Sequence, residues 1–123
     1  MQLTKSEEQL MQYLWKLEKA FMKDLMDLFP EPKPAPTTIA TLLKRMTDKK
    51  FVCYKEYGKS REYYPLIKKS DYSTKQVNGM IKSFFNNSVA QFASFFTQET
   101  NLSESELKEL RKIIDSEIQK KQQ

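Results

Sequence analysis

The sequence predicts a mainly α-helical chain with one small β-ribbon, and two observations support this prediction. The 123-residue chain has only two glycines and many Leu, Lys, Glu and Gln residues, which favours helices over a sandwich with many turns. A helical pattern over residues 36–50 is followed directly by two strand-like runs that meet at Gly58-Lys59-Ser60. This is the element order of a winged helix-turn-helix domain. We predict such a DNA-binding domain over residues 1–69 and C-terminal dimerisation helices over residues 70–123.

The N-terminal helices are predicted from their caps and from apolar spacing. Thr4 and Glu7 have the spacing of a capping box, so a first helix begins after Thr4 and runs to about Lys19. A shorter second helix is expected from Phe21 to Phe29, where a proline ends it. Alternating prolines then form a stiff connector, and Pro36 suits the first position of the next helix.

The predicted helix over residues 36–50 has two faces of different chemistry. Its apolar stripe has helical spacing and consists of Ile39, Leu42, Leu43 and Met46. The opposite face has hydroxyls near its start and two cations in its middle. Helix N-termini suit phosphate oxygens, and Thr and Arg also suit base edges in the major groove. We therefore predict a recognition helix whose DNA-binding residues are Thr37, Thr38, Thr41, Lys44 and Arg45.

The ribbon after this helix has a basic tip. Gly58 supplies the positive φ that a tight hairpin turn needs, and Lys59 and Arg61 flank the turn. We expect a wing at residues 57–61 that holds the DNA backbone through Lys59, Ser60 and Arg61. The alternative is a structural ribbon with charged edges.

The positive charge of the chain is concentrated in the same region. The net charge of the whole chain is +5, while residues 33–61 hold eight Lys/Arg against two Asp/Glu, a local net charge of +6. A clustered basic patch is the electrostatic pattern of a nucleic-acid-binding surface. The alternative is an ordinary solvated face.

The composition argues against several other kinds of site. The chain has no histidine, which removes the commonest general base and the commonest neutral metal ligand, so we expect no enzyme activity, no cofactor and no metal. The single cysteine, Cys53, excludes an intramolecular disulfide, and we expect it to be a packed residue rather than a redox sensor. No apolar run is long enough to span a bilayer and no signal peptide is recognisable, so we expect a cytoplasmic protein.

Two amphipathic helices are predicted after the ribbon. A long one begins near Ser70 or Ser73 and carries five phenylalanines, and the last begins at a capping box of Ser103 and Glu106. Their apolar residues exceed what a small winged domain can bury, which indicates a partner surface. We expect a homodimer; the alternative is that these helices pack only on each other and on the first helix. The expected dimer contacts are Met80, Ile81, Phe84, Phe85, Phe92, Phe95, Phe96, Leu110 and Ile114.

A second class of function fits part of this pattern. A protein-interaction module that does not bind DNA would keep the winged shape and dock a larger partner through its Phe-rich helix. Such a module has no reason to gather a net charge of +6 on the recognition helix and wing. We therefore favour a dimeric regulator that binds a palindromic DNA site.

Several stretches spread over nearly the whole chain also match one known family. They are Leu3 to Trp15, Thr38 to Met46, Phe51-Val52, Arg61 to Leu66 and Leu102 to Leu107. Together they resemble the penicillinase-repressor family of transcriptional regulators (BlaI/MecI/CopY type). The resemblance implies an N-terminal winged helix, a C-terminal helical dimerisation region and repression by binding palindromic operator DNA. It places the recognition-helix and wing residues named above at the family's DNA-facing positions.

The resemblance also implies a mode of regulation. In this family a membrane sensor-protease system commonly signals for the repressor to be cut in its dimerisation region, often at an Asn-Phe bond. No Asn-Phe pair occurs in this chain, although Gln91-Phe92 lies nearby. The copper-responsive branch carries paired cysteines near the C-terminus, and this chain has none there, so we expect no copper sensing. The family often has glycine where this chain has Lys50.

Overall fold

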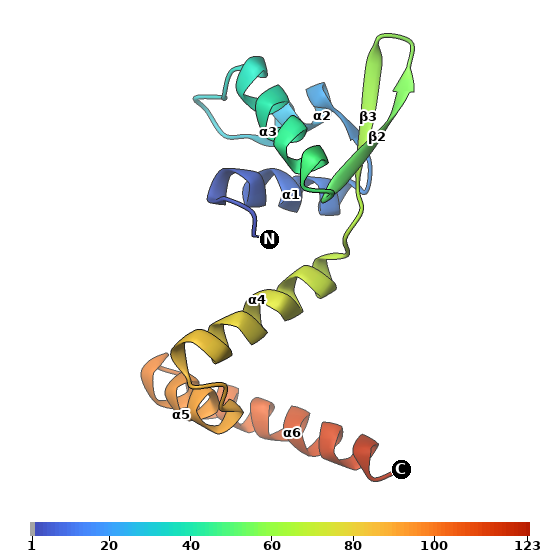
Figure 1. Ribbon diagram of the computed structural model, residues 1–123. Coiled ribbons are helices and arrows are strands. Elements are labelled where there is room, and N and C mark those ends of the chain that lie inside the picture. Colours follow the sequence, from blue (N-terminus) through green and yellow to red (C-terminus); the bar gives the residue numbers. More distant parts are fainter. Residues whose placement is uncertain (1) are drawn as a thin grey trace. The chain divides into compact units, whose positions relative to one another are not determined.

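The computed structural model describes residues 2–123, which form six helices and a three-stranded antiparallel sheet (Figure 1). This confirms the predicted fold class, a mainly helical chain with a small β-ribbon. The chain separates into two compact units, Met1–Thr74, which we call the winged unit, and Lys75–Gln123, which we call the C-terminal unit. No helix among the described residues is long and apolar enough to cross a membrane.

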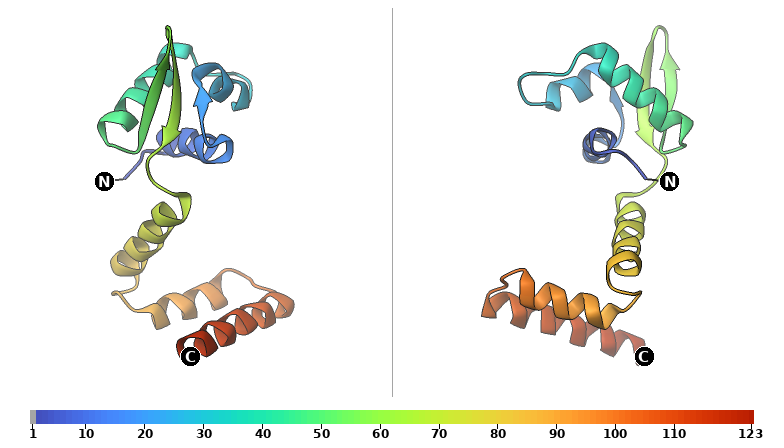
Figure 2. Two further views of the ribbon diagram at one scale, coloured as in Figure 1. Left: turned by 90° about the vertical axis from the view of Figure 1, so that its right-hand side faces the viewer. Right: turned by 60° about the vertical axis from the view of Figure 1, so that its left-hand side comes forward.

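The winged unit consists of three helices packed on the sheet, with the hairpin projecting beyond them (Figures 1 and 2). Its elements are α1 (Lys5–Leu17), β1 (Ala20–Phe21), α2 (Met22–Leu28), α3 (Pro36–Asp48), β2 (Val52–Tyr57) and β3 (Ser60–Pro65), followed by the first turn of α4 (Lys69–Phe84). The strand order is β1-β3-β2. Tyr63 of β3 lies opposite Ala20 on one side and Tyr54 on the other. Gly58 has the positive φ predicted for the hairpin turn, +62°.

The predicted starts of α1 and α3 are confirmed. The Thr4 hydroxyl accepts a hydrogen bond from the Glu7 amide, and the Glu7 carboxylate accepts one from the Thr4 amide. Pro36 lies in the first turn of α3, where its missing N–H is not needed. Helix α3, the predicted recognition helix, ends at Asp48, two residues earlier than expected, because Lys50 has a φ of +66° that cannot continue an α-helix. Glycine adopts this conformation most readily.

The core of the winged unit lies between the three helices and the sheet. The apolar stripe predicted for α3 is confirmed, since Ile39, Leu43 and Met46 are fully buried and Leu42 is nearly so. The other helices and the sheet complete the core with Leu10, Met11, Leu14, Leu25, Phe51, Val52 and Tyr63. The buried stripe fixes which face of α3 points outward.

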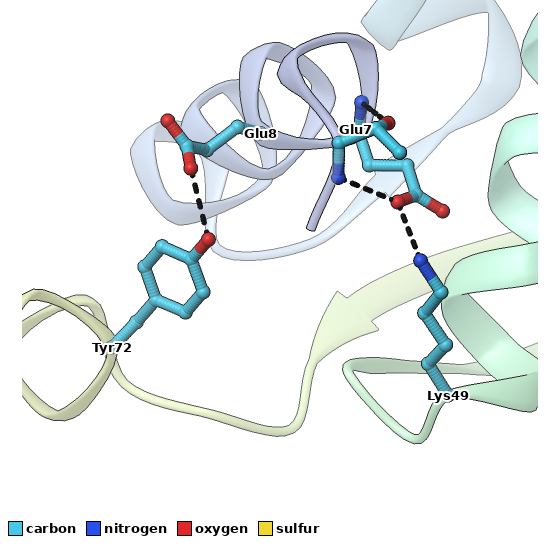
Figure 3. Close-up of polar contacts among 5 residues, drawn as sticks. Glu7, Glu8, Lys49 and Tyr72 are labelled. Atoms are coloured by element: carbon cyan, nitrogen blue, oxygen red, sulfur yellow. Dashed lines mark hydrogen bonds and ion pairs between the residues drawn. The ribbon is translucent and has the colours of Figure 1, made fainter. Parts of the chain in front are cut away.

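One charged side chain, Glu7, is fully buried among the described residues. Its Oε1 atom accepts hydrogen bonds from the Thr4 amide at 2.8 Å and from the Lys49 ammonium at 2.7 Å, as Figure 3 shows. Burial alone raises the pKa of Glu7, but the hydrogen bonds from Lys49 and Thr4 outweigh it, so the net pKa lies below the ordinary value for Glu. The ion pair joins the start of α1 to the residue that ends α3.

Glu7→Gln should lower the free energy of unfolding by about 1–3 kcal/mol at neutral pH, because a buried charge-assisted hydrogen bond is lost. A carboxylate with a lowered folded pKa stabilises the fold above its unfolded pKa, and this contribution disappears as the pH falls through the folded value. Urea unfolding from about pH 6 down to about pH 3 should therefore show a smaller loss of stability for the variant than for the wild type. Glu109→Gln, an exposed position on α6, is the control. Parallel pH profiles for wild type and Glu7→Gln would contradict the assignment.

The C-terminal unit contains the rest of α4, α5 (Val89–Glu99) and α6 (Glu104–Lys121). The prediction of one long helix through the phenylalanines is wrong, because α4 ends at Phe84 and a new helix begins after Ser88. Asn86 and Asn87 both have positive φ, which asparagine tolerates better than most residues. The Ser88 hydroxyl then caps α5 by accepting from the Gln91 amide.

The other two helix starts differ in how well they were predicted. Helix α4 begins at Lys69, so neither Ser70 nor Ser73 is its first residue. The capping box of Ser103 and Glu106 is confirmed at α6. Helices α5 and α6 lie side by side (Figure 2).

Candidate nucleic-acid interface

Helix α3 presents a polar face to solvent, opposite its buried stripe. All five residues predicted to bind DNA are exposed on it, namely Thr37, Thr38, Thr41, Lys44 and Arg45. The Thr41 hydroxyl donates to the Thr37 carbonyl oxygen at 2.9 Å, which leaves the hydroxyl oxygen able to accept a further hydrogen bond. This face combines acceptors and donors with cations on a helix of thirteen residues. An α-helix of this kind fits the major groove of B-DNA.

The wing at residues 57–61 carries the second set of predicted contacts. Lys59, Ser60 and Arg61 are all exposed. The Arg61 guanidinium lies over the ring of Tyr54, 4.3 Å from its centroid, and its Nε is 3.9 Å from a Glu56 oxygen. A side-chain hydrogen bond with Tyr63 raises the pKa of Arg61, and the electrostatic interaction with the nearby Tyr54 raises it further. Arg61 is therefore a permanently charged side chain held in place by the sheet, with half of its surface still accessible.

A groove of about 690 Å³ lies between the flank of α3 and the hairpin. It brings Lys44 of α3 together with Lys59, Ser60 and Arg61 of the hairpin, so four of the residues predicted to bind DNA share one surface. The other four predicted residues of α3 are exposed but do not line this groove, namely Thr37, Thr38, Thr41 and Arg45. The aromatic residues that line the groove are Phe21, Tyr54 and Tyr63.

The structure adds one cation to the basic patch predicted over residues 33–61 and shows that two others of that patch are engaged within the fold. Lys23 at the start of α2 lines the groove, which the sequence analysis did not predict because α2 carried no expected contact. Lys33 instead donates to the carbonyl oxygens of the α2 C-terminus, at Met26, Asp27 and Phe29. Lys49 is paired with the buried Glu7. Two of the eight cations between residues 33 and 61 thus hold the fold together.

The described residues contain no group of three or more Cys, Asp or Glu side chains placed to hold a metal ion. Cys53 is half-buried on β2, with its Sγ 3.9 Å from the Tyr54 carbonyl oxygen. A hydrogen bond with Cys53 raises the pKa of the neighbouring Tyr64. Cys53 lies outside the residues that line the groove.

Four of the nine residues expected at the dimer contact form a ring cluster in the C-terminal unit. Phe85 contacts Phe92 and Phe95 at centroid distances of 5.6 and 5.3 Å, and Phe92 stacks on Phe96. Phe84 is the most exposed of the set at 78%, whereas Ile81 is already buried within the single chain. The remaining expected contacts are exposed or half-buried: Met80, Leu110 and Ile114. Further exposed apolar residues were not predicted as contacts, namely Val77, Val89, Leu107, Ile113 and Ile118.

Known proteins similar to this chain are repressors and regulators. The family model described as the penicillinase repressor matches residues 3–116. Methicillin resistance regulatory protein MecI of Staphylococcus aureus is 26% identical over 115 residues, covering 93% of this chain and 94% of that protein. The penicillinase repressor of Bacillus licheniformis is 24% identical over 123 residues, covering 99% of this chain and 96% of that protein. A solved structure of a CopR repressor aligns with a TM-score of 0.46 and 25% identity, covering 55% of this chain and all of that one.

Proposed function

This chain belongs to the penicillinase repressor family and is a DNA-binding transcriptional repressor, and we propose that it binds a palindromic operator as a homodimer. Residues 1–69 bind DNA in this proposal, and residues 70–123 form the dimer. The observation that supports it best is the exposed Thr- and Arg-bearing face of α3, fixed by a buried stripe and flanked by a basic wing.

The proposed contacts divide into two kinds. Lys59, Ser60 and Arg61 of the wing, with Lys44 of α3, hold phosphates and set the position of the protein on the duplex. Thr38, Thr41 and Arg45 read base edges in the major groove. An arginine donates two hydrogen bonds to guanine, and a threonine hydrogen-bonds to a base edge or packs its methyl group against the thymine methyl. Thr37, in the first turn of α3, faces a phosphate near the helix N-terminus.

The dimer is supported by what the C-terminal unit lacks. Ile81 is the one buried hydrophobic residue between Lys75 and Gln123 in the described structure, while large apolar side chains along all three helices are exposed. A unit this small cannot stabilise three helices by so little burial. A second copy of the same surface supplies the missing apolar contacts in a two-fold arrangement. The two α3 helices of the dimer then bind two half-sites that lie about one turn of the DNA helix, or a multiple of it, apart.

Fluorescence anisotropy with a labelled duplex of mixed sequence tests the DNA-binding surface directly. The logarithm of the affinity should fall linearly with the logarithm of the salt concentration, because bound cations release counterions from the phosphates. Lys59→Ala should weaken binding to all sequences alike and reduce the slope by about one unit for each bound protomer. Lys112→Ala on α6 removes the same charge outside the proposed interface and should leave the slope unchanged.

Two outcomes of this titration would count against the proposal. Binding that does not depend on salt would contradict phosphate contacts altogether. Equal slope changes for Lys59→Ala and Lys112→Ala would show that the wing has no special position on the DNA.

A further inference from the structure

One buried tyrosine fixes the first turn of α4 to the winged unit. Tyr72 is 7% exposed, and its hydroxyl donates a hydrogen bond to Glu8 Oε2 at 2.9 Å, as Figure 3 shows. Its ring lies against Trp15 at a centroid distance of 5.7 Å and edge-on to Phe51 at 6.0 Å. A hydrogen bond from a hydroxyl to a carboxylate is stronger than one between two neutral groups. The start of α4 is therefore held by packing and by a directional bond.

The connector before α4 is held by the same part of α1. The Trp15 indole N–H donates to the Ile67 carbonyl oxygen at 2.8 Å. Ile67 itself packs against the core, although the segment between β3 and α4 has no regular structure. Both hydrogen bonds join residues more than fifty positions apart in the sequence. A connector that served only as a flexible tether would need neither of them.

The same turn of α1 also holds the end of the recognition helix. Glu7 binds Lys49, the residue that caps α3, and Glu8 binds Tyr72 in α4 (Figure 3). Phe51, against which Tyr72 packs, donates its amide hydrogen bond to the Met46 carbonyl oxygen in the last turns of α3. The capping box of Thr4 and Glu7 keeps this turn of α1 in one conformation. Adjacent carboxylates on a rigid turn thus hold the end of one helix and the start of another.

We propose that Tyr72 and Glu8 are positioning residues for operator recognition, which fix the start of α4 relative to the end of α3 and so restrict the half-site spacing that the dimer accepts. This inference rests on the proposed binding of a palindrome by a homodimer. A rigid connection lets both recognition helices bind at one spacing without strain, and this raises the effective concentration of the second helix at its half-site. A loose connection lowers that effective concentration and tolerates other spacings.

The test compares variants on three sets of duplexes: the selected palindrome, a single half-site, and palindromes with one or two base pairs inserted or removed at the centre. Tyr72→Phe keeps the ring and removes the hydroxyl. It should leave half-site affinity unchanged, weaken binding to the selected palindrome roughly tenfold, and reduce the penalty for altered spacing by at least about threefold. Tyr13→Phe is the matched control, since it removes a hydroxyl of α1 that accepts a hydrogen bond from the exposed Gln9 side chain.

A second pair of variants keeps the test decisive if Tyr72→Phe is unstable. Glu8→Gln retains an acceptor for the tyrosine hydroxyl and should restore most of the spacing preference that Glu8→Ala loses. An unchanged spacing profile in Tyr72→Phe and Glu8→Ala would overturn the inference, as would equal losses on the half-site and the palindrome, which indicate a general loss of folding. A wild type without any spacing preference would also overturn the inference, whereas a wild type that binds the palindrome no more tightly than the single half-site would contradict the proposed dimeric function.

Discussion

Phe84→Glu should convert the proposed dimer into a monomer at micromolar concentration and weaken operator binding by at least about 100-fold. Phe84 is 78% exposed in the single chain, so its replacement leaves the chain's own packing nearly intact. Burying a phenylalanine contributes about 1.5–3 kcal/mol, and a two-fold interface contains the side chain twice. A glutamate at the same place adds the cost of burying a charge. Multi-angle light scattering gives the mass of each variant, and anisotropy gives its operator affinity.

The control for this variant is a charge at a position of the same helix that lies about 120° around the helix axis from Phe84. Asn78→Glu lies on α4 at an exposed position that helical spacing places away from Phe84, and it should remain a dimer. Phe92→Glu is a less selective variant, because Phe92 packs against Phe85 and Phe96 within the chain. If Phe84→Glu is still a dimer at micromolar concentration, Phe84 lies outside the interface.

Arg45→Ala should reduce operator affinity by about 1–3 kcal/mol for each half-site, and by about twice that for a palindrome. The backbone carbonyl of Arg45 accepts a hydrogen bond from the Lys49 amide, and removal of the Arg45 side chain leaves this bond at the end of α3 intact. The loss on a duplex of scrambled sequence should be much smaller, because no guanine edge is read there. Competition between the operator duplex and the scrambled duplex measures the ratio of the two affinities directly.

The control for Arg45 is an arginine of similar exposure elsewhere. Arg111→Ala on α6 removes the same group and should change neither affinity. Equal losses of Arg45→Ala on operator and scrambled DNA would show that Arg45 contacts only phosphates.

The recognition helix and the hairpin could be predicted because their determinants are local. The apolar period of Ile39, Leu42, Leu43 and Met46 alone fixes the buried face of α3, and hence the exposed one. A single glycine fixes the hairpin turn. Strand β1 escaped prediction because it has two residues and exists only by pairing with β3, some forty positions later.

Other features of the fold and of the site could not be predicted, because they depend on contacts that the spacing of residues in the sequence does not reveal. The apolar pattern continues through Asn86 and Asn87, so a spacing argument joins α4 and α5 into one helix although the backbone turns there. A charge count treats all cations alike, and it cannot separate Lys33 and Lys49, which hold the fold, from Lys44 and Lys59, which face the groove. The bond between Tyr72 and Glu8 likewise joins distant residues and has no sequence pattern.

The most direct test of the central claim is selection of bound DNA from a random duplex library, with sequencing of the enriched pool. The proposal predicts a two-fold symmetric site whose half-sites lie about one helical turn, or a multiple of it, apart. The symmetry should disappear for Phe84→Glu, and the base preference at the Arg45 contact should relax for Arg45→Ala. A pool without any enriched sequence, at a salt concentration where non-specific binding is weak, would contradict operator recognition by this dimer and would favour a protein-docking role for its exposed apolar helices.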